Sequence, residues 1–123
     1  MQNINRSDLF DPELLKKWQE VDAQNWKGII KDIVEVFFAS TPDEYSKLLQ
    51  AVATKDRKKL ELYSHSLKSS HGNVGAKKLQ YAFAAIEKMS MTAPWDKVQT
   101  EMVMIEDLKN NTYPLLKSYM GTL

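Results

Sequence analysis

The sequence of 123 residues contains no cysteine. This absence excludes disulfide bonds, thiolate zinc sites and cysteine nucleophiles. The most hydrophobic stretch, residues 33–39, is too short to cross a membrane and is interrupted by Glu35. The first residues also lack the apolar segment of a signal peptide. We therefore expect a cytoplasmic protein with no membrane partner.

Glycine and proline are scarce as well, with four of each, and no stretch of alternating polar and apolar residues indicates a β-strand. The hydrophobic share of 43% and the charged share of 27% are typical of a globular protein. The length fits a single domain over residues 1–123 with one core. Apolar residues recur at helical spacing, which predicts an all-α fold: an antiparallel four-helix bundle with an extra short N-terminal helix, about six helices in total.

All the expected helices except the fifth begin at a proline or at a side chain that can cap a helix N-terminus, and Gly75 ends the fourth helix. In chain order, the helices are expected from Asp11-Pro12 to about Val21, from Asn25, from Thr41-Pro42, from Asp56 to about Asn73, from Ala76 to about Met89, and from Pro94 onward.

Two prolines mark expected interruptions. Thr41 can cap a helix that has Pro42 at its first position, and Glu44 completes a capping box, so a new helix is expected there. Pro114 lies inside the apolar pattern of the last helix. It is expected to kink or end that helix, because proline lacks an N–H group and clashes with the preceding turn.

The net charge is only +1, but basic residues gather in one segment. Residues 51–81 carry seven basic side chains against two acidic ones, so this segment is +5 and the rest of the chain is −4. The segment is either a patch for an acidic partner or a phosphate, or an ordinary solvated helix face. Because it lacks arginine richness and interleaved aromatic residues, we expect no nucleic-acid partner.

The expected fourth helix carries an exposed histidine. At about 100° per residue, its apolar side chains share one arc, and His65 lies about 175° from the centre of that arc. His65 therefore points to solvent. A neutral imidazole is a good nucleophile, and its ordinary pKa keeps it largely neutral at cytosolic pH.

The helix face around His65 has the composition of a docking surface. It offers small residues that permit close approach, one apolar contact and an ammonium group that can offset a phosphoryl charge. The residues expected to form the site are His65 and Lys68, and those expected to contact a partner are Lys58, Leu62, Ser69 and Gly72. Glu61 lies one turn before His65, where it either orients the ring or pairs with a lysine as a solvated charge.

The segment His65-Ser66-Leu67-Lys68-Ser69-Ser70-His71-Gly72-Asn73-Val74-Gly75-Ala76 resembles the signature of histidine-containing phosphotransfer (HPt) domains. That signature consists of a histidine, any residue, an apolar residue, lysine, glycine, small residues, and an apolar-glycine-alanine turn. The resemblance extends over about residues 26–119, which would form the bundle core. It implies that His65 is phosphorylated on Nε2, that Lys68 steadies the phosphoryl group, and that the second and third helices stack as one broken rod.

The resemblance also implies a function. The chain would be a phosphorelay intermediate that takes a phosphoryl group from the aspartate of one receiver domain and passes it to another. The partners would be response-regulator receiver domains, including one within a hybrid histidine kinase. The receiver would supply Mg²⁺ and its aspartate, while this chain would bind no cofactor or metal. We expect a monomeric phosphocarrier that is not an independent enzyme.

Two positions depart from the family pattern. Ser69 stands where the family usually has glycine, and its hydroxyl adds bulk or a hydrogen bond under the phosphoryl group. His71 stands where a small residue is usual, near the edge of the buried stripe, and we expect it to be a structural residue. The two histidines are six positions apart, so they cannot bind one metal ion on a single helix face.

Two other functions remain open on the sequence. The chain could be an HPt-like binding module that docks on a receiver or histidine kinase and regulates it without being phosphorylated. It could also be a helical adaptor unrelated to phosphorelays, with a signature that arose by chance. An independent enzyme is disfavoured, because residues 72–75 are too short for a nucleotide-binding glycine loop and lack its downstream lysine.

Overall fold

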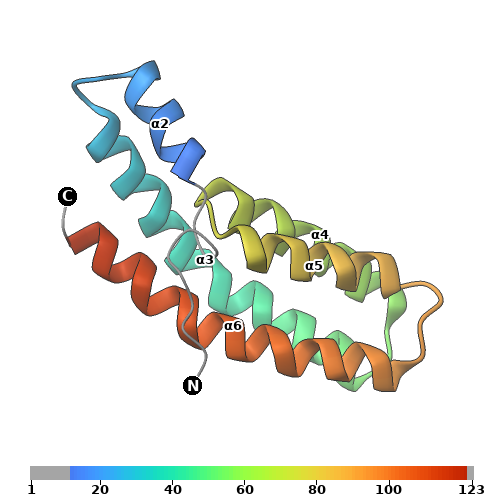
Figure 1. Ribbon diagram of the computed structural model, residues 1–123. Coiled ribbons are helices and arrows are strands. Elements are labelled where there is room, and N and C mark those ends of the chain that lie inside the picture. The colour runs from blue at the N-terminus through green and yellow to red at the C-terminus, as the bar shows by residue number, and fades with distance from the viewer. Residues whose placement is uncertain (1–11, 122–123) are drawn as a thin grey trace.

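The computed structural model describes residues 12–121, which form five α-helices and no strand. The helices are α2 (Pro12–Val21), α3 (Trp26–Ala53), α4 (Arg57–Asn73), α5 (Lys77–Met89) and α6 (Trp95–Gly121). The hairpin of α4 and α5 packs against the long helices α3 and α6, and α2 lies beside the N-terminal part of α3 (Figure 1). The predicted all-α bundle is therefore confirmed.

The expected break at Thr41 and Pro42 was wrong, because α3 runs through Pro42 as one continuous helix. Thr41 is buried inside this helix, and its hydroxyl donates to the Phe37 carbonyl at 2.5 Å instead of capping a new N-terminus. A proline inside a helix costs about 3 kcal/mol. Buried apolar side chains on both sides of Pro42 offset this cost; they are Ile30, Val34, Phe37, Tyr45 and Leu48. The helices expected from Asn25 and from Thr41-Pro42 are thus a single helix, and the broken rod that the resemblance implied has no break.

The last helix also continues through its proline. Pro114 lies inside α6, which bends along its length without ending there (Figure 1). Thr112 and Leu116 are both buried on either side of Pro114, so the same face of the helix stays in the core. An end of the helix, one of the two outcomes expected at Pro114, is therefore not found.

The ends of α4 are formed by the residues that the sequence indicated. The Asp56 carboxylate accepts from the backbone N–H of Lys59 at 3.1 Å and so caps the N-terminus. At the other end Gly75 has a φ of 74°, a left-handed conformation that glycine adopts without strain. The cap expected at Asn25 differs, because Asn25 makes no capping bond and instead bonds with its backbone N–H and its amide to the Asp22 carboxylate. The Asp11 cap lies outside the described residues.

The core fixes which face of α4 meets solvent. Leu60 and Leu67 are completely buried, and Val74 is nearly so. The opposite face of α4 is left open along the side of the bundle. Among the described helices, none has the length and mean hydropathy needed to span a membrane.

Candidate functional site

His65 lies on the solvent-facing side of α4, with 63% of its side chain exposed. This confirms the orientation predicted from the helical periodicity, since the buried residues of α4 occupy the opposite side. Lys68 follows one turn later on the same helix, with 28% of its side chain exposed. The two side chains expected to perform the chemistry therefore lie on one accessible strip of the bundle.

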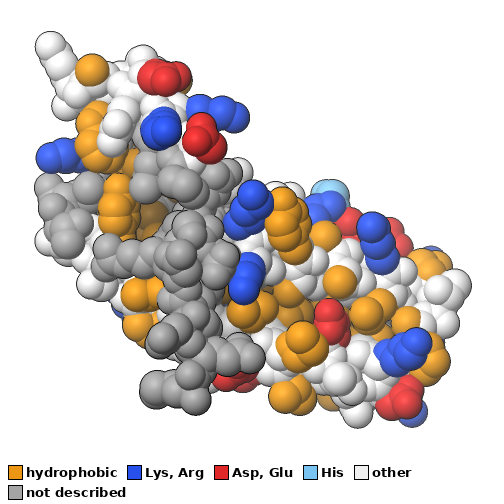
Figure 2. Space-filling view, in the orientation of Figure 1, with side chains coloured by type: hydrophobic (Ala, Val, Ile, Leu, Met, Phe, Trp, Pro, Cys, Tyr) orange, Lys and Arg blue, Asp and Glu red, His pale blue; other side chains and the backbone are white. Residues whose placement is uncertain are grey.

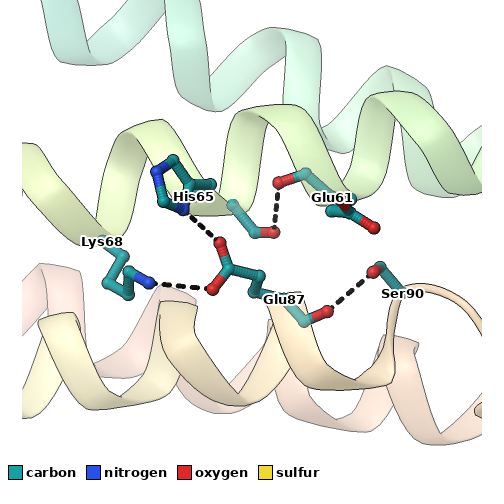
Figure 3. Close-up of polar contacts among 6 residues, drawn as sticks. Glu61, His65, Lys68, Glu87 and Ser90 are labelled. Atoms are coloured by element: carbon teal, nitrogen blue, oxygen red, sulfur yellow. Dashed lines mark hydrogen bonds and ion pairs between the residues drawn. The ribbon is translucent and has the colours of Figure 1, made fainter.

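Glu87 of α5 connects these two side chains, as Figure 3 shows. One of its carboxylate oxygens, Oε2, lies 2.5 Å from Nδ1 of His65. The other oxygen, Oε1, accepts from Nζ of Lys68 at 2.8 Å. The sequence analysis missed Glu87, because it is 22 positions from His65 and belongs to another helix. Helical periodicity within α4 carries no signal for a residue that packing brings from α5.

The Glu87 carboxylate determines which ring nitrogen of His65 is free. The Lys68 ammonium, and to a lesser extent the His65 ring, hold the pKa of the Glu87 carboxyl below its ordinary value. An ionised carboxylate only accepts hydrogen bonds, so the proton of a neutral His65 ring must be on Nδ1. The lone pair is then on Nε2, which is the nitrogen turned away from Glu87 (Figure 3).

Glu61, the residue that the sequence suggested for orienting the ring, does not contact it. Within residues 12–121 the Glu61 carboxylate makes no hydrogen bond or ion pair, and only its backbone carbonyl is engaged, by the Ser64 hydroxyl. In Figure 3 the His65 ring leans toward the Lys68 end of α4, away from Glu61. Glu61 is therefore a solvated charge, as the second alternative held, but the lysine pairing expected with it is not found among the described residues.

A second set of contacts fixes the end of α5 that carries Glu87. The Ser90 hydroxyl donates to the Glu87 carbonyl at 2.6 Å. Arg57, in the first turn of α4, donates to the carbonyls of Ser90 and Ala93, each at 3.0 Å. Its guanidinium group also lies 4.6 Å from the ring centroid of Trp95. These bonds join the start of α4 to the end of α5 and so restrict the position of Glu87 relative to His65.

The residues expected to contact a partner differ in exposure. Lys58 and Ser69 are exposed, and Leu62 is 60% exposed. Gly72 is only partly exposed and lies against Gln80 of α5, whose Nε2 would be 2.6 Å from a Cβ atom added at Gly72. A side chain at position 72 would therefore have to displace the terminal amide of Gln80, a contact that the sequence did not indicate.

The second histidine is part of the core. His71 is completely buried and packs edge-on against Phe37, with ring centroids 4.8 Å apart. Its Nδ1 lies 2.7 Å from the Leu67 carbonyl and its Nε2 lies 2.8 Å from the Tyr113 hydroxyl. The carbonyl only accepts, so Nδ1–H donates to it and Nε2 accepts from Tyr113. Burial lowers the pKa of His71 to about 4, so it stays neutral at neutral pH. The structural role expected for His71 is confirmed.

The described residues, 12–121, hold no cluster of three or more histidine, aspartate or glutamate side chains that could bind a metal ion. The arrangement around His65 thus consists of an exposed nucleophilic nitrogen, an ammonium group and a carboxylate that holds both. These groups suit acceptance of a phosphoryl group, for which positioning and charge neutralisation supply most of the catalysis.

Comparisons with known proteins show the fold and the family of the chain. Two solved structures have the same fold. The histidine-containing phosphotransfer domain of ArcB from Escherichia coli is 22% identical with a TM-score of 0.80, over 94% of this chain and 96% of that one. Histidine-containing phosphotransfer protein B (HptB) from Pseudomonas aeruginosa PAO1 is 18% identical with a TM-score of 0.79, over 97% of this chain and 99% of that one.

Comparison with curated protein sequences gives no match. The sequence model described as "Hpt domain" matches residues 32–117, which include His65, Lys68 and Glu87. Because this match covers most of the chain, the protein belongs to the Hpt domain family.

Proposed function

We propose that this chain is a phosphorelay intermediate that accepts a phosphoryl group on Nε2 of His65 from a receiver-domain aspartate and passes it to another receiver domain. Members of the Hpt family act in phosphotransfer within two-component systems. The observation that carries the proposal is the Glu87 contact, which leaves the Nε2 lone pair of an exposed histidine free.

In the forward step, the Nε2 lone pair of His65 attacks the phosphorus atom of an aspartyl phosphate. The N–P bond forms while the P–O bond to the aspartate breaks, and the bonding electron pair leaves with the aspartate carboxylate. The ring gains positive character as the bond forms. Glu87 stabilises this charge, because its carboxylate holds the Nδ1 proton throughout. The reverse step, toward a second receiver, uses the same groups.

Lys68 is suited to the charge on the phosphoryl group. An ammonium group has three N–H donors, and one of them is used by Glu87 at 2.8 Å. The remaining two are free to reach phosphoryl oxygens from the turn that follows His65. The receiver domain would supply Mg²⁺ and its aspartate, so this chain acts as a phosphocarrier and not as an independent enzyme.

The docking surface in this proposal is the exposed face of α4, with Lys58, Leu62, Ser69 and Gly72 around His65. A basic surface favours encounter with the acidic pocket of a receiver domain. Figure 2 shows side chains coloured as Lys or Arg near the histidine on this side of the molecule, together with acidic side chains. We further propose that the chain works as a cytoplasmic monomer, since one exposed imidazole is sufficient for each transfer.

Replacement of the acceptor tests the proposal. His65→Gln is expected to keep the fold, because the side chain is exposed, and to abolish phosphoryl acceptance. The measurements are circular dichroism and the transfer of acid-labile radiolabel from a phosphorylated receiver domain. His71→Gln is the matched control, since this histidine is buried and its Nε2 is occupied by Tyr113. The control is expected to accept label, and undiminished labelling of His65→Gln would overturn the proposal.

A further inference from the structure

Ser69 has an unused hydrogen-bond donor on the face that carries His65. It lies four positions after His65, which places it one turn further along the same exposed side of α4. The other serines of α4 use their hydroxyl groups within the chain; they are Ser64, Ser66 and Ser70, which donate to the Glu61 carbonyl, the Glu44 carboxylate and the Leu67 carbonyl. Within residues 12–121 the Ser69 hydroxyl makes no such bond, so it is available to a group outside the chain.

The orientation of the His65 ring directs a group on Nε2 toward this hydroxyl. In Figure 3 the ring leans toward the Lys68 end of α4, Nδ1 faces Glu87, and the other nitrogen is turned away from that carboxylate. A phosphoryl group on Nε2 would therefore project over the turn that holds Lys68 and Ser69. Of the exposed residues in that turn, Ser69 is the one at i+4, directly beside His65 on the helix surface.

The charges around Nε2 make a further donor useful. A phosphoryl group brings between one and two negative charges and three acceptor oxygens. Lys68, the cation one turn after His65, already gives one N–H to Glu87, and Glu87 itself is a negative charge next to the ring. A neutral hydroxyl that donates to the phosphoryl group adds stabilisation without changing the charge of the site.

We propose that the Ser69 hydroxyl donates a hydrogen bond to an oxygen of the phosphoryl group on Nε2 of His65, and that this bond stabilises the phosphorylated form of the chain relative to its free form. The inference rests on the proposed function, because it needs a phosphoryl group on His65. The hydroxyl keeps its proton, and the covalent step is the one already described. The bond exists only in the phosphorylated form, so it shifts the equilibrium of transfer and not only its rate.

The equilibrium constant for phosphoryl transfer between this chain and one receiver domain tests the inference. It is the ratio of phosphorylated to free chain multiplied by the ratio of free to phosphorylated receiver. Measured at concentrations where few complexes form, it is independent of how tightly the two proteins dock. Ser69→Ala is expected to lower this constant about threefold to tenfold, the effect of one lost hydrogen bond. Ser69→Thr, which keeps the hydroxyl, is expected to stay within about twofold of wild type.

Ser46→Ala is the matched control, because Ser46 is an exposed serine on α3. It is expected to leave the equilibrium unchanged. If Ser69→Ala matches wild type while His65 still takes up phosphate, the inference is overturned and the proposed function stands. If Ser69→Thr changes the constant as much as Ser69→Ala, the hydroxyl is not the cause, which also overturns it. If wild-type His65 takes up no phosphate, both proposals fail.

Discussion

At the level of single residues, Glu87 is the side chain on which the proposed chemistry depends most. It accepts from both His65 and Lys68, so one carboxylate sets the proton position on the ring and holds the ammonium nearby. An imidazole without such a partner exchanges its proton between the two nitrogens, and only one of the two forms presents the Nε2 lone pair.

Replacement of Glu87 is therefore expected to affect the tautomer and the transfer rate together. Glu87→Ala should shift the His65 proton from Nδ1 toward Nε2 and slow phosphoryl acceptance about tenfold or more, since the nucleophilic form becomes less populated. ¹⁵N NMR of the imidazole measures the tautomer, and rapid-quench transfer from a phosphorylated receiver measures the rate.

Two matched variants separate the contributions of Glu87. Glu87→Gln keeps an oxygen that can accept from Nδ1–H, so its loss of rate should be smaller than that of Glu87→Ala. Glu61→Ala removes a carboxylate on the same face that makes no bond within the described residues, and it should have no effect on the tautomer. An unchanged tautomer in Glu87→Ala would contradict the role of this contact.

At the level of secondary-structure elements, the turn between α3 and α4 has one strained residue. Lys55 has a φ of 55°, which is the left-handed conformation that residues with a Cβ atom rarely adopt. The turn is nevertheless closed by backbone hydrogen bonds, from Lys55 N–H to the Val52 carbonyl and from Asp56 N–H to the Ala51 carbonyl. Packing of α4 on α3 thus holds a conformation that the residue at position 55 does not favour.

Relief of this strain is expected to stabilise the fold. Lys55→Gly should raise the free energy of unfolding by about 1 kcal/mol, because glycine adopts positive φ without a steric penalty. Urea denaturation followed by circular dichroism measures the change. Lys31→Gly, at an exposed position inside α3, is the control and should lower stability by a similar amount. A loss of stability in Lys55→Gly would show that the left-handed turn carries no strain.

At the level of the whole molecule, His71 joins helices that are distant in sequence. Its ring lies between Phe37 of α3 and Phe83 of α5, at centroid distances of 4.8 and 4.7 Å, and it accepts from Tyr113 of α6. A charged His71 would lose the Tyr113 bond, because both ring nitrogens would then be donors. The neutral ring is therefore a condition for the packing of four helices.

This condition predicts how stability changes with pH. Burial lowers the pKa of His71 to about 4, against an ordinary value of 6.5, so the unfolded chain binds one more proton between these values. The stabilisation is fully present above pH 6.5 and is lost as the pH falls toward 4. The loss from this group is about 3 kcal/mol. Denaturant unfolding at a series of pH values measures it.

His71→Gln provides the comparison for the pH series. Glutamine does not titrate, and its amide can replace both hydrogen bonds of the ring. The stability of wild type relative to the variant should therefore fall as the pH falls below 6.5, with a slope that approaches about 1.4 kcal/mol per pH unit. Parallel curves would mean that His71 binds its proton equally well in the folded and unfolded chains.

The sequence by itself determined the helical class, the buried stripe of α4, the exposed side of His65, and the two ends of α4 at Asp56 and Gly75. Each of these features depends on residues within a few positions of one another, so helical periodicity and capping preferences are sufficient to predict it. The sequence also predicted a structural role for His71. It lies six positions after His65, which places it near the edge of the buried arc of α4, and the structure buries it completely.

Only the tertiary structure decided the features that depend on two helices. The continuity of α3 through Pro42 follows from core contacts on both sides of the proline, which outweigh the local preference for a new helix start. The Glu87 contact with His65 and the fit of Gly72 against Gln80 follow from the register of α5 on α4. That register is set by the packing of one helix face against another. A local sequence pattern describes the face of one helix only, so it does not predict which residues of α5 lie opposite which residues of α4.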